Sequence, residues 1–192
     1  MNETFYALGK RITDISLAML GGFLFLPVVL ITAVFIKMTS RGSIIYKQER
    51  IGLRGETFLL YKFRSMIIEA EKDSGPILAS EDDSRVTKLG KIMRKTRMDE
   101  LPQFINILKG DMSIVGPRPE RPFFVKQHKS LQGVRLLVKP GLTGLAQIEG
   151  AYHTHPRNKL RYDFIYIKNR SLFFDIKIIL KTVLVVLTRK GT

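Results

Sequence analysis

Two adjacent carboxylates, Asp99 and Glu100, follow directly after a strongly cationic stretch of the chain. Residues 85–97 read RVTKLGKIMRKTR, with six Lys or Arg and no acidic residue. A carboxylate can attack a phosphoryl group and form an acyl phosphate, which divides one displacement into two. Attack on a diphosphate also requires neutralisation of its charge, which Arg, Lys and Mg²⁺ supply. The pair and its surroundings therefore suit phosphoryl transfer with an anionic substrate.

The same acidic pair also fits a purely structural role. Apolar side chains from Leu101 to Leu108 recur at i, i+3, i+4 and i+7, which predicts a helix, and Gly110 would end it. Pro102 is tolerated only in the first turn, so the helix begins close to Asp99. An Asp at a helix start accepts hydrogen bonds from free backbone N–H groups. On the residues alone, a helix cap remains an alternative to a nucleophile or metal ligand.

Further cations lie in the segments on either side of this helix. Residues 43–64 are rich in β-branched and aromatic side chains around a turn at 52–55, which predicts two strands. Lys62 and Arg64 share one face of the second strand, because side chains alternate along a strand. Arg118 stands between two prolines. A stiff Pro-Arg-Pro presents a guanidinium to phosphate oxygens with little loss of entropy, although a plain surface turn also fits these residues.

Glycine and proline punctuate residues 138–150 on both sides of Gln147. This pattern predicts a structured loop and a strand. The phosphate-binding loop of many nucleotide hydrolases requires the spacing GxxxxGK[ST], which is absent from this segment.

One long apolar segment lies near the N-terminus. The 22 residues between Asp14 and Lys37 carry no charge, and a helix needs about 20 residues to cross a bilayer. Pro27, near the middle, removes a backbone donor and crowds the preceding turn. Basic residues flank both ends of the segment, whereas positive charge marks the cytoplasmic side. A re-entrant hairpin and a bent membrane span both remain open.

The overall composition points to anionic partners. The chain has 192 residues, 32 Lys and Arg against 17 Asp and Glu, a net charge of +15 and 45% hydrophobic residues. The hydrophobic content excludes a disordered basic tail. The absence of Cys excludes a disulfide scaffold, a thiolate zinc site and a thiol nucleophile. The charge favours a phosphorylated substrate, acidic lipid or nucleic acid.

A second apolar region closes the chain. In residues 171–192, the charged residues Asp175, Lys177 and Lys181 interrupt the apolar ones at short spacing. This pattern is typical of an amphipathic helix that lies on a surface. A helix that packs on the core of the protein fits equally well.

Three runs of sequence carry a resemblance to a known family. They are YKFRSM, RKTRMDELPQFINILKGDMSIVGPRPE and KPGLTGLAQIEG, which begin at Tyr61, Arg94 and Lys139. The chain resembles the bacterial sugar transferase family, the monotopic phosphoglycosyl transferases that begin polyprenol-linked glycan assembly. The resemblance covers nearly the whole chain. The pattern from DELPQ to GPRP is long and specific, so it favours catalysis over a helix cap.

The resemblance implies a reaction and roles for particular residues. The family transfers a sugar-1-phosphate from a UDP-sugar to a polyprenol phosphate, such as undecaprenyl phosphate, and releases UMP. Asp99 would be the nucleophile that forms a phosphosugar intermediate, and Glu100 its essential neighbour. Mg²⁺ would sit at the dyad with Asp99 as a ligand. The residues expected to bind substrate are Lys62, Arg64, Arg94, Arg118 and Gln147.

The resemblance also implies an α+β, mostly helical fold. Residues 1–40 would form a re-entrant membrane helix broken at Pro27, and residues 41–192 an interfacial catalytic domain with a small β-hairpin and amphipathic helices around the active site. Both ends would lie on the cytoplasmic face of a bacterial inner membrane.

The implied partners are a UDP-sugar, polyprenol phosphate and anionic membrane lipid, and nucleic acid is not among them. The product would be the first lipid-linked sugar of an exopolysaccharide, capsule, O-antigen or glycoprotein glycan. A homodimer through the apolar N-terminal segment and the C-terminal helix stays open. The alternative from another class is a membrane-tethered basic protein that binds anionic lipid or nucleic acid. That alternative gives no reason for the acidic pair or for Pro-Arg-Pro.

Overall fold

The computed structural model describes residues 3–72, 75–77, 83–149 and 156–188. Most of them are helical, and the strands form two small sheets, which confirms the mostly helical α+β fold. The α-helices are α1 (Glu3–Leu24), α2 (Leu26–Thr39), α3 (Lys88–Lys95), α4 (Gln103–Lys109), α5 (Pro122–Gln127), α6 (Leu145–Glu149), α7 (Pro156–Asn169) and α8 (Leu172–Thr188). The strands are β1 (Ile45–Ile51), β2 (Thr57–Phe63), β3 (Ser113–Val115) and β4 (Gly141–Thr143). The 3₁₀ turns are η1 (Leu53–Gly55), η2 (Met98–Glu100), η3 (Lys129–Leu131) and η4 (Gly133–Leu137).

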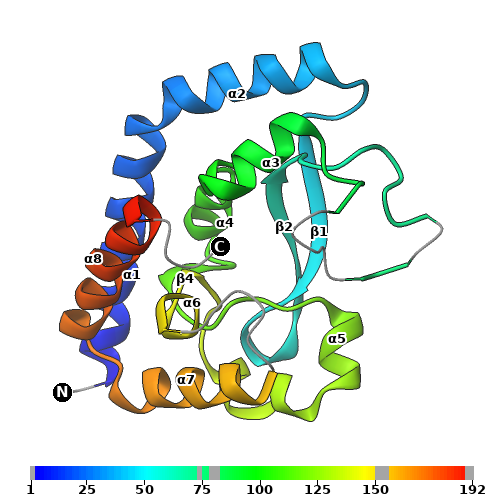
Figure 1. Ribbon diagram of the computed structural model, residues 1–192. Coiled ribbons are helices and arrows are strands. Elements are labelled where there is room, and N and C mark those ends of the chain that lie inside the picture. The colour runs from blue at the N-terminus through cyan, green and yellow to red at the C-terminus, as the bar shows by residue number, and fades with distance from the viewer. Residues whose placement is uncertain (1–2, 73–74, 78–82, 150–155, 189–192) are drawn as a thin grey trace.

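Helices α1 and α2 form a bent pair around one side of the molecule. Figure 1 shows α1 running up one edge and α2 turning across the top, above α3. The two axes differ by 59°, and the break lies at Phe25, two residues before Pro27. Pro27 has no N–H for the carbonyl of Phe23, and its ring crowds that carbonyl, which explains the bend. Among the described residues, no single helix is long and apolar enough to cross a bilayer, whereas the bent pair qualifies by length and composition.

The surface of the bent pair is apolar and exposed on both sides of the break. On a soluble protein, a concentration of exposed apolar side chains marks a surface that meets a partner or a membrane. The exposed large apolar residues of the two helices between residues 19 and 38 are Met19, Leu20, Phe23, Leu24, Phe25, Leu26, Leu30, Ile31, Val34, Phe35 and Met38.

Charged residues tie α1 firmly to the rest of the protein. Buried Asp14 accepts hydrogen bonds from the Ser113 hydroxyl and the Ile114 N–H, each at 2.9 Å, and so holds β3. Arg11 donates to two backbone carbonyls near the end of α4, at 2.7 and 3.0 Å. The apolar N-terminal segment is therefore joined to the remaining chain by buried polar contacts as well as by packing.

The two small sheets differ in how well the sequence predicts them. Strands β1 and β2 pair antiparallel, from Ile45 opposite Phe63 to Ile51 opposite Thr57, which confirms the predicted hairpin. Strands β3 and β4 pair parallel. A strand in residues 138–150 was expected, but its partner β3 was not. A Cβ at Gly141 would collide with the Gly116 backbone, so this close parallel contact needs glycine.

The sequence left open whether the C-terminal helix lies on a surface or packs on the core, and α8 does both. One face is buried and includes Ile178 and Asp175, whereas Phe173 and Leu180 are exposed. Figure 1 shows α8 lying beside α1.

The hydrophobic interior consists of two clusters. The main core cluster comprises Ala18, Leu60, Ile107, Met112, Ile114, Val115, Tyr166 and Ile178, and a second, smaller cluster comprises Ile36, Phe63 and Met93.

The contact between Asp14 and β3 predicts a large effect on stability. Asp14→Ala removes the acceptor of the buried Ile114 N–H, and a buried bond to a charged group contributes about 1.5–3 kcal/mol. For a chain of this size we expect Tm to fall by about 4–10 °C, measured by circular dichroism in detergent. Thr13→Ala is the matched control, because its hydroxyl donates to the Gly9 carbonyl within the same helix and makes no other hydrogen bond to the residues described. Equal Tm values for both variants would contradict the role of Asp14.

Candidate active site

The acidic pair lies in the 3₁₀ turn η2, between α3 and α4. Arg97, immediately before this turn, has φ +58°, a left-handed conformation that lets the chain change direction after α3. Pro102 leads into α4, and Gly110, with φ +93°, ends it. The helix predicted to begin near Asp99 is present, with its first turn wound as 3₁₀.

The two carboxylates are both buried, but they have different surroundings. Asp99 is 7% exposed and Glu100 is 8% exposed. Glu100 accepts hydrogen bonds from Arg118 Nη2 at 2.6 Å and from Lys62 Nζ at 3.1 Å. Asp99 accepts no hydrogen bond from any residue that the structure describes. The helix-cap interpretation of the pair is therefore wrong, because neither carboxylate holds a backbone N–H of α4.

The pKa shifts of the pair follow from this asymmetry. Burial raises the pKa of Asp99; the charge of Lys62 opposes that shift and the charge of Glu100 adds to it. Burial would also raise the pKa of Glu100, but the adjacent Arg118 and Lys62 outweigh it and hold that pKa well below its usual range. Glu100 thus anchors the cations, while the Asp99 carboxylate is left clear for another partner.

Three of the five expected substrate-binding residues gather at this pair. Lys62 from β2 and Arg118 from the Pro-rich segment contact Glu100 directly. Arg94 from α3 donates from Nε to Ser65 Oγ at 2.9 Å, and its charge lowers the pKa of Asp99. A strand, a helix and a stiff loop therefore converge on one dyad from well-separated parts of the sequence.

The other two expected residues lie in different contacts. Arg64 donates to the backbone carbonyls of Arg41, at 2.6 Å, and Ser40, at 3.1 Å, so it fastens the end of α2 to β2. Gln147, in α6, donates to the Leu142 carbonyl at 3.0 Å. Among the described residues, no hydrogen bond joins either side chain to the dyad, so their substrate contacts remain predictions.

The sequence pattern did not predict that α4 buries polar side chains. Ile107 packs in the main core, but Ile105 and Leu108 of the predicted apolar stripe are 50% and 42% exposed. Asn106 is buried instead and joins α4 to β2: it accepts from the Tyr61 N–H at 3.0 Å and donates to the Leu59 carbonyl at 2.7 Å. This contact fixes Lys62, the next residue of β2, relative to the dyad. The only sequence signal was a polar residue on the side of the helix opposite the apolar stripe.

The donor set suits magnesium only in part. Mg²⁺ prefers oxygen ligands and is usually bound by one or two carboxylates together with substrate phosphates and water. Asp99 and Glu100 supply two adjacent carboxylates. Within the described ranges, no cluster of three or more His, Cys, Asp or Glu forms a complete protein cage. The residues present therefore fit a metal that shares its coordination with a phosphorylated substrate.

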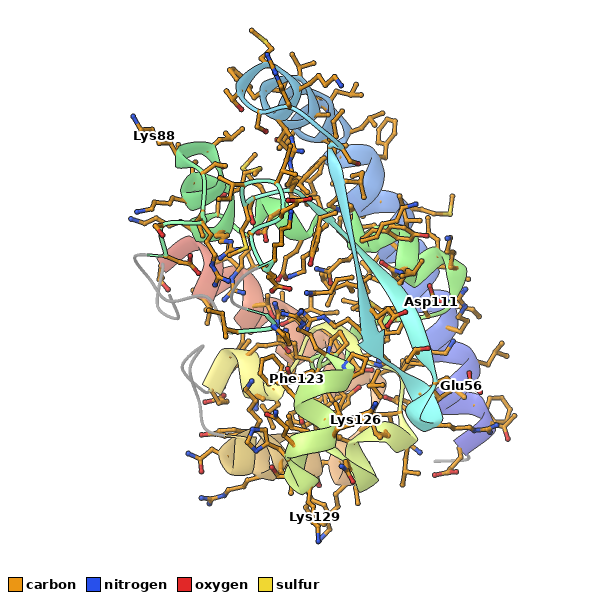
Figure 2. All side chains as sticks on the ribbon, turned by 90° about the vertical axis from the view of Figure 1, so that its right-hand side faces the viewer. Glu56, Lys88, Asp111, Phe123, Lys126 and Lys129 are labelled. Atoms are coloured by element: carbon orange, nitrogen blue, oxygen red, sulfur yellow. The ribbon has the colours of Figure 1, made fainter. Side chains whose placement is uncertain are left out.

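Most of the remaining charged side chains lie at the periphery of the molecule. Figure 2 shows Lys88 of α3 pointing outward near the bent pair, and Lys126 and Lys129 pointing outward at the opposite end. The interior cations at Glu100 are thus separate from these surface charges. The fold and site together define an α+β protein built around a buried carboxylate pair with Lys and Arg partners, joined to a bent apolar helix pair.

Comparison with known proteins gives the family. The bacterial sugar transferase family matches residues 5–189. The chain is 45% identical over 192 residues to UDP-N-acetylgalactosamine-undecaprenyl-phosphate N-acetylgalactosaminephosphotransferase of Aeromonas hydrophila, covering 97% of this chain and 45% of that one. It is 44% identical over 182 residues to UDP-glucose:undecaprenyl-phosphate glucose-1-phosphate transferase of Escherichia coli, covering 91% and 39%.

A shorter relative matches over nearly its whole length. An uncharacterized sugar transferase of Bacillus subtilis, EpsL, is 39% identical over 182 residues, covering 95% of this chain and 89% of that one. The chain spans less than half the length of the first two relatives. On the family match, the chain belongs to the bacterial sugar transferase family.

An unpaired amide beside the dyad gives a stability prediction. Gln103, at the start of α4, is 2% exposed, and its Nε2 has no hydrogen-bond partner in the part of the chain that the structure describes. A buried unpaired donor costs about 1–3 kcal/mol. Gln103→Met has a similar shape and should raise Tm of the ligand-free protein by about 2–8 °C. Asn106→Leu is the contrasting variant, because it removes satisfied hydrogen bonds and should lower Tm. A Tm loss in both variants would show that the Gln103 amide is satisfied in solution.

Proposed function

We propose that the chain transfers a sugar-1-phosphate from a UDP-sugar to undecaprenyl phosphate, giving undecaprenyl-diphosphate-sugar and UMP. The observation that carries this proposal is the asymmetric dyad: Glu100 binds two cations, while buried Asp99 keeps its carboxylate free. The family supports the same conclusion. The relatives in Aeromonas hydrophila and Escherichia coli are named as transferases that use UDP-sugars and undecaprenyl phosphate.

In the first step, an Asp99 carboxylate oxygen attacks the β-phosphorus of the UDP-sugar. A bond forms between that oxygen and the phosphorus, and the bond from the phosphorus to the bridging oxygen breaks. The electron pair leaves on the bridging oxygen with UMP. In the second step, the phosphate oxygen of undecaprenyl phosphate attacks the same phosphorus and Asp99 departs. Covalent catalysis of this kind splits one difficult displacement into two easier ones.

The cations around Glu100 hold and neutralise the diphosphate. Arg118 presents a guanidinium from a stiff Pro-Arg-Pro, a geometry that matches phosphate oxygens. Lys62 and Arg94 add charge from a strand and a helix. Asp99, with Glu100 beside it, would hold Mg²⁺. The bound ion would add to the neutralisation of the diphosphate charge. The developing charge on UMP is thereby stabilised in a largely buried site.

The exposed apolar helices support a membrane location for this site. We propose that residues 1–40 form a re-entrant segment bent before Pro27, and that residues 41–192 form the catalytic region on the cytoplasmic face of a bacterial inner membrane. The exposed apolar faces of α1, α2 and α4 and the basic surface of α3 suit contact with anionic lipid. An isoprenoid substrate then reaches the dyad without leaving the bilayer.

The nucleophile assignment predicts a covalent adduct. With UDP-sugar and Mg²⁺ but no polyprenol phosphate, intact-protein mass spectrometry should show the wild-type chain with one added sugar phosphate. UDP-glucose, UDP-galactose and UDP-N-acetylgalactosamine form the panel, and the sugar that gives UMP release identifies the substrate. Asp99→Asn should form no adduct and lose transfer by more than about 1000-fold, because an amide is a poor nucleophile.

Two controls separate chemistry from folding in this experiment. Asp99→Asn should keep the Tm and the membrane association of the wild type, because Asp99 accepts no hydrogen bond among the described residues. Glu149→Gln removes an exposed carboxylate whose ion pair, among the described residues, is with Lys181, and it should keep full activity. Turnover by pure, folded Asp99→Asn would refute the nucleophile assignment.

The re-entrant arrangement predicts that both ends of the bent pair face the same side. The chain has no Cys, so Glu3→Cys and Arg41→Cys each provide a single label site. Both should react with a membrane-impermeant maleimide in inverted inner-membrane vesicles and be protected in intact spheroplasts. Labelling of the two positions from opposite sides would show a bent span instead.

A further inference from the structure

Residues 117–120, the segment that carries Arg118, have too few backbone donors to fix their own conformation. Pro117 and Pro119 have no backbone N–H, so the segment lacks half the donors that a strand or turn would use. All four consecutive carbonyls are instead bound by donors from outside the segment. At 2.9 Å each, Pro117 accepts from the Gly141 N–H, Arg118 from Arg135 Nη2, Pro119 from Arg50 Nη1 and Glu120 from the Ile51 N–H.

The donor to the Arg118 carbonyl belongs to a buried ion pair. Arg135, in η4, is 4% exposed and donates from Nε to Asp163 Oδ2 at 3.0 Å; Asp163, in α7, is 2% exposed. Removing two charges from water is costly, and a buried ion pair often stabilises a fold no better than well-packed apolar residues. Stability alone therefore does not explain why Arg135 and Asp163 are buried as a pair. The position of the pair points to another role.

One face of α7 supports the whole segment. Lys159, Asp163 and Tyr166 occur at i, i+4 and i+7, so they lie on the same side of the helix. Lys159 donates to the Glu120 carboxylate at 3.0 Å. The Tyr166 hydroxyl lies 3.1 Å from the carbonyl oxygen of Val115, just before the segment begins, and 2.9 Å from Asp175 Oδ1, so these two acceptors share its one proton. The helix thus holds the segment at both ends, and Asp163 acts at its centre through Arg135.

We propose that Arg135 and Asp163 are a positioning pair for Arg118. Asp163 binds Nε of the planar Arg135 guanidinium, which aims Nη2 at the Arg118 carbonyl. With its backbone fixed, the Arg118 side chain reaches Glu100 at 2.6 Å and stands ready for the diphosphate. Neither member of the pair contacts the dyad. Its catalytic effect rests on the proposed function, but its hold on Arg118 does not.

The test uses a variant that removes the pair without leaving a buried charge. Arg135→Met/Asp163→Leu replaces both charges by apolar side chains of similar size, so the full-length chain should fold. We expect kcat for UMP release to fall about 10- to 100-fold, because the reacting groups lose their alignment. Arg121→Met/Glu71→Leu is the matched control. It removes an ion pair one residue beyond Glu120 that does not touch the Arg118 carbonyl, and it should change kcat less than about twofold.

A mutant cycle separates positioning from a general structural role. In an Arg118→Met background, Arg135→Met/Asp163→Leu should cause no further loss of kcat, because the side chain to be positioned is already gone. Losses that multiply would overturn the proposal, as would wild-type kcat in the folded double variant. If that variant does not fold, Arg135→Lys serves instead. It retains a charge beside Asp163 but lacks the fork that reaches both acceptors, so it should show the same non-additive loss.

A measurement without turnover keeps this proposal distinct from the proposed function. In protein labelled with ¹⁵N-arginine, the Nε–H signal of Arg118 is assigned by its absence in Arg118→Met. Removal of the pair should lower the order parameter of this signal, and the Arg121→Met/Glu71→Leu control should leave it unchanged. If the wild type released no UMP with any UDP-sugar, the proposed function would fail and the signal would still decide the positioning role. An order parameter of the Arg118 Nε–H that does not change when the pair is removed would overturn the positioning role.

Discussion

The Glu100 carboxylate is the contact on which the rest of the site depends. It joins three segments: the turn η2, strand β2 through Lys62, and the Pro-rich segment through Arg118. A buried carboxylate is unstable alone, and two cations beside it would repel each other without it. The three groups therefore stabilise one another only in this arrangement. The consequence for Asp99 is that its neighbour holds the cations, so Asp99 takes no part in joining these segments and its burial raises its pKa.

Helix α4 buries polar as well as apolar side chains. In a water-soluble domain, the apolar stripe of a helix faces the core and the polar side faces solvent. Here Gln103 and Asn106 are buried beside Ile107, whereas Ile105 and Leu108 are exposed. The proposed membrane location accounts for this exposure, because lipid accepts apolar side chains as readily as a protein core does. The polar inner side is then available to connect the dyad to β2.

Local patterns in the sequence predict the helices and strands of this fold. Contacts between residues far apart in the sequence decide which side of each element is buried and which partner each side chain binds. The hairpin, the helix ending at Gly110 and the dyad follow from periodicity, turn residues and a specific motif. The exposure of Ile105 and Leu108 on α4 does not follow from the sequence. Periodicity predicts an apolar stripe but does not say what the stripe contacts. Arg64 looked equivalent to Lys62 from its spacing, yet it lies past the end of β2 and binds the end of α2. The pairing of Arg135 with Asp163 joins residues 28 positions apart and leaves no local signal.

The polar contacts of α1 join the bent apolar helix pair to the rest of the fold. Asp14 binds the Ile114 N–H and the Ser113 hydroxyl, and β3 runs directly into Gly116 and the segment that carries Arg118. Arg11 binds carbonyls near the end of α4, the helix that follows the dyad. One helix thus holds the strand before Arg118 and the helix after Asp99. The division near residue 40 stays a prediction, and these polar contacts join the regions on its two sides. The apolar helix is part of the framework that aligns the dyad with its cations.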